Sequence, residues 1–145
     1  MTKRISDMLR ALAQHMDDLG VAMYMAAGAY PATPTRPVAT FGKLPTAPDL
    51  AVALNHYNTD PNFFERATPL MFVQLRWRAP TLLGVNDLVD DANTALTTYT
   101  PASWPGGVNT LWMVRATSSV PPAVEDENGR WERPDNYEIR LTPGG

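Results

Sequence analysis

Hydrophobic residues recur at helical spacing near the start of the chain. The residues of this stripe are Ile5, Met8, Leu9, Leu12, Met16 and Leu19. Apolar residues three or four positions apart line one face of a helix, so the pattern predicts an amphipathic helix over residues 3–19. Thr2 is its expected N-cap, and Gly20 is its expected stop because glycine readily adopts the conformation that ends helices.

A second stripe with the same spacing lies in the middle of the chain. It consists of Val85, Leu88, Val89, Ala92, Leu96 and Tyr99. This stripe predicts a second helix. Asn86 or Asp87 is the expected N-cap, because a side-chain oxygen at that position can accept a hydrogen bond from the first turn.

Strict alternation predicts a strand over residues 70–79. One side of this strand carries Met71, Val73, Leu75, Trp77 and Ala79, and the other carries Leu70, Phe72, Gln74, Arg76 and Arg78. We expect the first side to face the core. Shorter patterns predict further strands at 21–25, 38–41, 50–57, 108–117 and 136–141.

The order of these elements predicts an α+β fold. Helix, strands, helix and strands follow one another, which favours a single mixed or antiparallel sheet flanked by two helices. Two long connections interrupt this order: a proline-rich segment, 26–48, and a polar link, 118–135, with a turn expected at Asn128–Gly129. We therefore expect residues 1–145 to form one domain with extended proline-rich loops.

Composition narrows the classes of function. The chain has 145 residues, a formal net charge of −3 and no cysteine. The absence of cysteine excludes disulfides, thiolate metal sites and cysteine nucleophiles. The charge argues against a nucleic-acid binder that works by bulk positive charge. No apolar run approaches the roughly 20 residues that span a bilayer, and the N-terminus does not resemble a signal peptide. We expect a soluble protein made in the cytoplasm.

The sequence contains few residue patterns that are typical of catalytic or metal sites. His15 and His56 have no spacing that would bring them together with carboxylates. Asp87 and Asp91 lie four apart on the second predicted helix and could hold Mg²⁺ or act as acid and base, but such pairs are more often a solvated helix face. There is no phosphate loop, nucleophile elbow or zinc signature. We expect no catalytic, metal or cofactor site, and an enzyme that uses Asp87 or Asp91 remains the minor alternative.

Arginines and loop aromatics point instead to protein contacts. The candidate interface residues are Arg76, Arg78, Arg115, Arg133, Tyr30, Phe41 and Trp131. Arginine is enriched at protein interfaces because its planar guanidinium pairs with carboxylates and stacks on aromatic rings. Ordinary solvated charge on a sheet is the alternative. Val120, in the second long connection, is a further apolar loop residue. We expect Trp77, Trp112 and Tyr137 to fill the core.

Four motifs occur in a familiar order. They are FGKLPTAPDLAVALNHY (41–57), VQLRWRAP (73–80), NDLVDDANTAL (86–96) and RATSSVPPAVEDENGRWERPDNYEIRL (115–141). In this order they resemble the tail terminator or minor capsid proteins of long-tailed bacteriophages. The resemblance covers most of the chain.

The resemblance implies a virion protein that forms a ring, usually a hexamer, between the last ring of the tail tube and the neck. Its implied partners are its own copies, the major tail tube protein and a neck or stopper protein, and DNA passes through the ring. Neither catalysis nor a cofactor is implied. A stopper or head-completion protein is the alternative, which sequence distinguishes poorly from a terminator. We expect the Arg76/Arg78 face to contact a neighbouring subunit or the tube.

Overall fold

The fold is built on one curled sheet. A computed structural model describes residues 4–58, 60, 62–116 and 121–142. Its elements are α1 (Ile5–Asp18), β1 (Val38–Phe41), β2 (Ala51–Tyr57), the 3₁₀ helix η1 (Phe63–Glu65), β3 (Leu70–Ala79), α2 (Leu82–Leu96), β4 (Ala102–Trp104), β5 (Val108–Arg115), β6 (Val124–Glu125) and β7 (Trp131–Leu141). The strand order is β1-β2-β3-β7-β5-β4, and β6 pairs with β7 beside this path.

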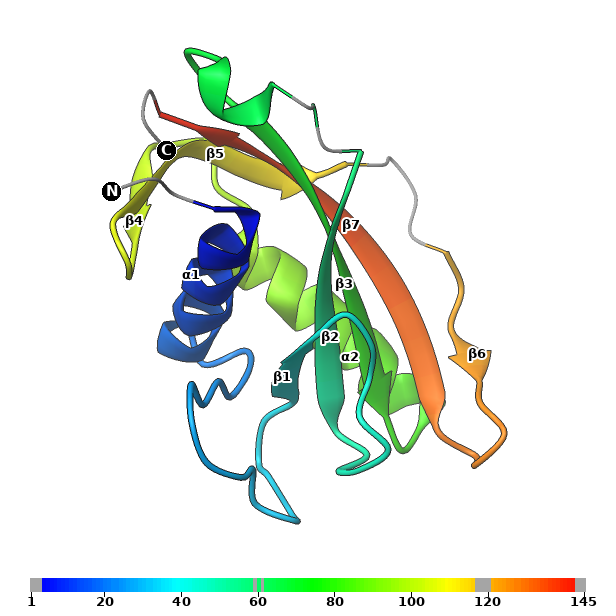
Figure 1. Ribbon diagram of the computed structural model, residues 1–145. Coiled ribbons are helices and arrows are strands. Elements are labelled where there is room, and N and C mark those ends of the chain that lie inside the picture. Colours follow the sequence, from blue (N-terminus) through cyan, green and yellow to red (C-terminus); the bar gives the residue numbers. More distant parts are fainter. Residues whose placement is uncertain (1–3, 59, 61, 117–120, 143–145) are drawn as a thin grey trace.

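The sheet is mixed, as predicted. The β1–β2 pair is parallel, and the pairs of β3 with β2 and of β7 with β3, β5 and β6 are antiparallel. Figure 1 shows α1 and α2 on the same side of the sheet, which curls around them. The predicted α+β fold is therefore confirmed.

The first helix forms where the stripe predicted it. Arg4 is its N-cap, and the Arg4 N–H donates to the Asp7 carboxylate at 2.9 Å. At the other end Gly20 has φ of +79°. The Gly20 N–H donates to the Asp17 carbonyl at 2.9 Å, and the next N–H, of Val21, donates to the Met16 carbonyl at 3.1 Å. This pair of bonds closes the helix, so the predicted stop is confirmed. Thr2 lies outside the described residues.

The second helix begins earlier than predicted. Thr81 is the N-cap, and its Oγ1 accepts a hydrogen bond from the Gly84 N–H at 3.0 Å. The expectation that Asn86 or Asp87 caps it is wrong because the first turn, which carries exposed Leu82 and Leu83, precedes the buried stripe. Tyr99 lies beyond the end of the helix.

The last strand also begins earlier than predicted, at Trp131. Proline usually argues against a central strand because it has no N–H to donate. The backbone N–H and C=O groups of even-numbered β7 residues point away from β3. The Asn136 carbonyl accepts from the Ala116 N–H, whereas the N–H of odd-numbered Leu141 donates to the Pro69 carbonyl beside β3. Pro134 lies between the stretches paired with β5 and β6, so no hydrogen bond between described strands is lost there. The turn at Asn128–Gly129 is confirmed by the β6–β7 hairpin, in which Gly129 has φ of +78°.

The strand predicted at 21–25 does not form. Only Met23 pairs there, as a single parallel bridge to Val38. The Met23 N–H donates to the Pro37 carbonyl at 2.7 Å, and its carbonyl accepts from Ala39 at 2.8 Å. This bridge lies along the outer edge of β1, whose predicted bounds, 38–41, are confirmed.

The core lies between the helices and one face of the sheet. The predicted inward side of β3 is confirmed, since its five residues are at most 3% exposed: Met71, Val73, Leu75, Trp77 and Ala79. They form one cluster with Met8, Leu12 and Met16 of α1 and Val85, Val89 and Leu96 of α2. At the rim of this cluster, His15 of α1 stacks on Trp104 of β4 with 5.3 Å between the ring centroids.

Candidate interaction surface

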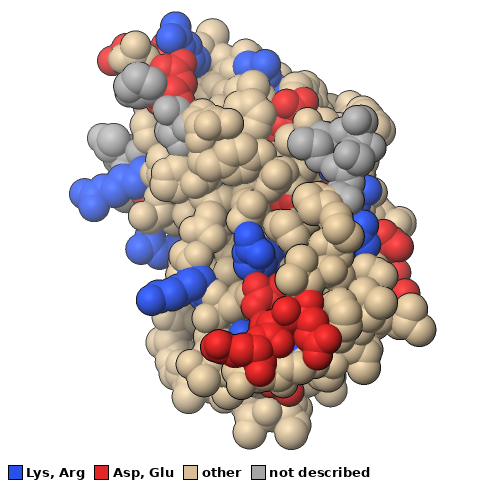
Figure 2. Space-filling model, turned by 90° about the vertical axis from the view of Figure 1, so that its right-hand side faces the viewer, with Lys and Arg blue, Asp and Glu red and all other residues tan. Residues whose placement is uncertain are grey.

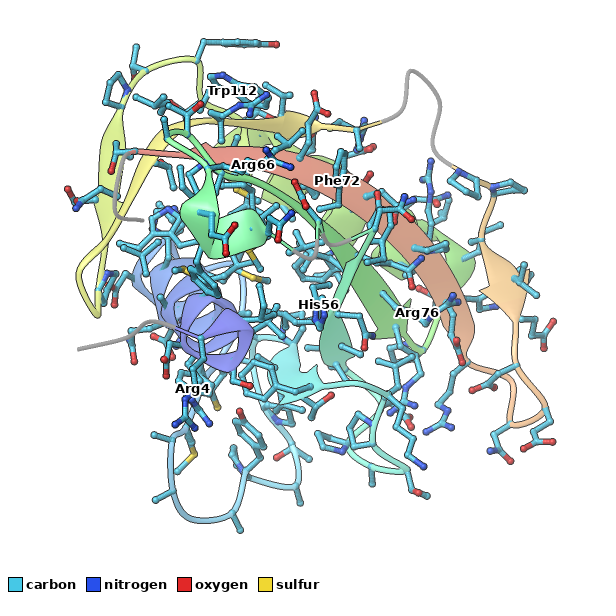
Figure 3. The ribbon with its side chains drawn as sticks, turned by 45° about the horizontal axis from the view of Figure 1, so that its top comes forward. Arg4, His56, Arg66, Phe72, Arg76 and Trp112 are labelled. Atoms are coloured by element: carbon cyan, nitrogen blue, oxygen red, sulfur yellow. The ribbon has the colours of Figure 1, made fainter. Side chains whose placement is uncertain are left out.

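The other face of the sheet is covered by neither α1 nor α2 (Figure 1). Residues from four strands alternate with the core residues and lie half-buried on this face. We call it the open sheet face and define it as Asn55, Tyr57, Leu70, Phe72, Gln74, Arg76, Trp112, Val114, Glu132, Pro134, Asn136, Glu138 and Arg140. Figure 3 shows Trp112, Phe72 and Arg76 spread along it, whereas Arg4 lies apart at the start of α1.

Aromatic contacts run across the open sheet face. The rings of Tyr57 and Phe72 lie side by side on β2 and β3, with centroids 5.7 Å apart. On the opposite flank the Arg140 guanidinium lies over the Trp112 ring at 5.7 Å. The solvent side of an antiparallel sheet is usually polar. Here aromatic and aliphatic side chains share it with amides and arginines, which is typical of a contact surface.

The two arginines of β3 differ in their surroundings. The Arg76 side chain is 40% exposed and its Nη1 lies 3.7 Å from Oε1 of Glu132. Arg78 is only 2% exposed. Its Nε donates to the Asp49 carbonyl at 2.9 Å and its Nη2 to the Pro48 carbonyl at 2.7 Å. Burial, with Arg130 nearby, lowers the pKa of Arg78. The expectation that Arg78 lies on an exposed face beside Arg76 is corrected, because residues 48–49 cover it.

Arg115 lies on the helix side of the sheet, where β5 pairs it with the core residue Tyr137. It holds the carboxylate of Asp135 in a two-point contact, with Nε 3.0 Å from Oδ1 and Nη2 2.8 Å from Oδ2. Asp135 is 1% exposed. Hydrogen bonding to Asp135 raises the pKa of Arg115. Arg115 therefore stabilises the fold through Asp135 and does not share a surface with Arg76.

The Arg133 side chain also makes hydrogen bonds within the chain. Its β3 partner in the sheet is the core residue Trp77, so it points to the helix side. Its Nη1 donates to Oδ1 of Asn86 on α2 at 2.8 Å, and its Nε donates to the Pro121 carbonyl at 3.0 Å. Arg133 thus ties the segment before β6 to α2.

The predicted loop aromatics are divided between the fold and the surface. The Tyr30 hydroxyl donates to the Ala39 carbonyl at 2.7 Å and accepts from the Met25 N–H at 3.1 Å, and burial raises its pKa. Trp131 is partly buried against the core. Only Phe41 is exposed, at 42%, with an edge contact to Tyr24. Val120 lies outside the described residues.

Trp112 is the residue that the sequence placed on the wrong side. A bulge in β5 shifts the register between Thr110 and Trp112. Met113 therefore points into the core, and Trp112 points to the open sheet face. Trp77 and Tyr137 are fully buried, so the prediction for them is confirmed. Apolar residues lie on both sides of β5. A central strand has the same pattern, so the sequence alone does not mark the outer side of β5 as a contact surface.

Hollows lie at both ends of the open sheet face. Near η1 a hollow of about 390 Å³ is lined by Phe63, Leu70, Phe72, Arg66 and Arg140, among others. At the other end a hollow of about 410 Å³ lies between residues 42–46 and the β6–β7 hairpin. The charged lining of the second hollow consists of Lys43, Arg76, Arg78 and Arg130 with Glu127 and Glu132. Its cations are largely neutralised, because Arg130 is ion-paired with Asp126 and Asp49. Figure 2 shows the acidic side chains that gather on the side of the molecule where β6 and β7 lie.

Catalytic and metal chemistry finds no support in the described parts of the chain. No three His, Asp or Glu side chains converge there on a possible metal position. Asp87 and Asp91 lie exposed on α2, and His56 lies exposed near the end of β2. Burial lowers the pKa of His15, which is the change expected of a histidine packed on an indole. None of the helices in the described ranges is long and apolar enough to cross a membrane.

A comparison with protein-family models finds a match over most of the chain. The family model described as bacteriophage tail terminator protein matches residues 15–143, which is most of the chain. A search of curated proteins finds no match. The chain belongs to the bacteriophage tail terminator family, so it is a structural protein of the phage tail. This confirms the resemblance carried by the four motifs.

Proposed function

We propose that the chain forms a ring, a hexamer as the resemblance implies, that caps the head-proximal end of the tail tube. The ring stops tube polymerisation and provides the surface to which the filled head is joined. Its partners are its own copies, the major tail tube protein and a neck or stopper protein. In this proposal the protein is made in the host cytoplasm and ends in the neck of the virion.

The observation that carries this proposal is the open sheet face. A ring subunit needs two unlike lateral surfaces, and further surfaces for the tube below and the neck above. On the open sheet face Phe72 and Trp112 lie half-buried among polar residues with no helix over them, and an apolar patch with a polar rim is typical of an interaction site. The net charge of −3 is compatible with a lumen through which DNA slides without sticking.

Electron microscopy of lysates from a phage that lacks this gene tests the proposal. We expect overlong tubes without heads, because nothing ends polymerisation, and normal tails when the gene is supplied from a plasmid. Tails of normal length beside heads that leak DNA would instead indicate a stopper or head-completion protein.

Point variants connect this test to the open sheet face. A Phe72→Glu chain supplied from the plasmid should fold yet leave the tubes overlong, because it places a charge within the contact surface. Arg10→Glu is the matched control, since Arg10 is 59% exposed on α1, far from the proposed surface. Normal tails with Phe72→Glu would remove the open sheet face from the proposal.

A further inference from the structure

One edge of the sheet is formed by β1. Among the described strands β1 pairs with β2, and its other side is the end of the strand order. The Val38 N–H donates to the Leu50 carbonyl on the β2 side. The backbone groups of Pro37, Ala39 and Phe41 therefore point outward, because successive residues of a strand direct their N–H and C=O groups to opposite sides. An edge of this kind is a template for a strand of another chain.

Residues 23–30 already occupy these outward groups, and we call them the edge cap. Pro37 has no N–H, and its carbonyl accepts from the Met23 N–H at 2.7 Å. The Ala39 N–H donates to the Met23 carbonyl at 2.8 Å. The Ala39 carbonyl accepts from the Tyr30 hydroxyl at 2.7 Å. Every outward hydrogen-bonding group of Pro37 and Ala39 is thus satisfied from within the chain.

Asp17, near the end of α1, fixes the edge cap in place. Its Oδ2 accepts from the Tyr24 N–H at 2.8 Å. The Arg36 guanidinium donates to the Asp17 carbonyl at 3.0 Å and lies 3.7 Å from the Asp17 carboxylate. Inside the cap the Tyr30 hydroxyl also accepts from the Met25 N–H at 3.1 Å. The cap is therefore tied to both α1 and β1, although most of its residues are exposed.

The opposite edge of the sheet is protected in a different way. β4 has only 3 residues, Ala102–Trp104, and it lies between Pro101 and Pro105. Proline cannot donate to a ladder, so a very short strand between two prolines offers little to a further strand. β1 contains no proline, and a cover made of other residues takes that role.

We propose that the edge cap is an autoinhibitory contact that keeps a strand of a second copy from pairing with β1. Copies of the chain then do not associate by strand addition at this edge, and assembly is left to side-chain surfaces such as the open sheet face. The cap ends at Ala39. Its release would join the outward groups of Ala39 to those of Phe41, the last residue of β1, into a usable edge. This inference does not depend on the proposed ring.

Hydrogen exchange on the folded chain tests the edge cap itself. Tyr30→Phe removes the hydroxyl that holds the Ala39 carbonyl and keeps the ring. Exchange at the amides of Met23 and Ala39 should become about fivefold faster, because a lost hydrogen bond of ordinary strength shifts a local opening equilibrium by that order. Tyr57→Phe on β2 is the matched control and should leave both amides unchanged. Unchanged exchange in Tyr30→Phe overturns the proposal.

Sedimentation tests what the edge cap prevents. Tyr30→Phe combined with Asp17→Ala releases the cap at both ends. This double variant, shown by circular dichroism to be folded, should form species larger than those of wild type at equal concentration. Absence of larger species from the folded double variant overturns the proposal.

Two substitutions at Phe41 show whether any larger species form through the backbone of β1. Adding Phe41→Pro to the double variant should abolish them, because it removes an outward N–H that a new strand needs. Adding Phe41→Ala should not, because it removes the ring and keeps the N–H. Equal effects of the two substitutions would assign the association to the exposed ring or to general loosening of the chain, and either result overturns the proposal.

Discussion

The two faces of the sheet differ in what covers them. On β3, the side that faces the helices is at most 3% exposed from Met71 to Ala79. On the other side Leu70, Phe72, Gln74 and Arg76 are all half-buried, although no helix covers them. Apolar content alone therefore does not distinguish a core face from the proposed assembly face. What separates them is whether the chain itself supplies the cover.

The largest expected effect is on the covered face. Trp77 is fully buried, so Trp77→Ala should lower the free energy of unfolding by about 3–5 kcal/mol, because it removes a large apolar group and leaves a cavity. Phe72→Ala on the same strand should cost less than half as much, since Phe72 already contacts water. Urea denaturation of the purified chains measures both. Equal losses would show that the open sheet face is part of the core.

The two arginines of β3 provide the next comparison. Arg78→Met should cost about 1.5–3 kcal/mol, because it removes charged hydrogen bonds to the carbonyls of Pro48 and Asp49. Arg76→Met should change stability by about 0.5 kcal/mol or less, because an exposed pair at 3.7 Å contributes little. Denaturation curves of the two single variants decide this. A stable Arg78→Met chain would contradict its role in holding residues 48–49. Because Arg76 can be replaced with little loss of stability, it is the better of the two arginines at which to test assembly.

The smallest expected effect is a pH dependence. Burial lowers the pKa of His15 below its ordinary value of 6.5, partly opposed by Asp18. The unfolded chain therefore binds more protons than the folded chain just below pH 6.5, so stability is complete above that pH and falls as the pH drops through the folded pKa. Thermal unfolding of wild type and His15→Gln at about pH 7.5 and about pH 5.5 tests this. The loss on acidification should be larger for wild type, and equal losses would show that His15 is not the cause.

Much of the fold could be predicted from local patterns. The α1 stripe, the inward side of β3 and the Asn128–Gly129 turn depend on residues close together in the sequence, and all three are confirmed. The position of Arg78 depends on residues 48–49, which lie far away in the sequence. No local signal shows that this segment folds over a strand face.

The site was predicted less well for the same reason. A bulge in β5 moves Trp112 to the open sheet face and Arg115 to the helix side, and strict alternation cannot show where such a bulge occurs. Pro134 was expected in the polar link, 118–135, yet it lies in β7, at a position where the missing N–H would have met no described strand. Of the predicted interface residues, only Arg76 and Phe41 remain exposed and outside the internal hydrogen-bond network of the described chain.

Covalent footprinting shows whether assembly covers the open sheet face. Hydroxyl-radical labelling of Phe72 and Trp112 should be compared between the free protein and the protein in intact tails. We expect both side chains to be labelled in the free protein and protected in tails, while Trp77 is protected in both states. Equal labelling of Phe72 and Trp112 in the two states would contradict the claim.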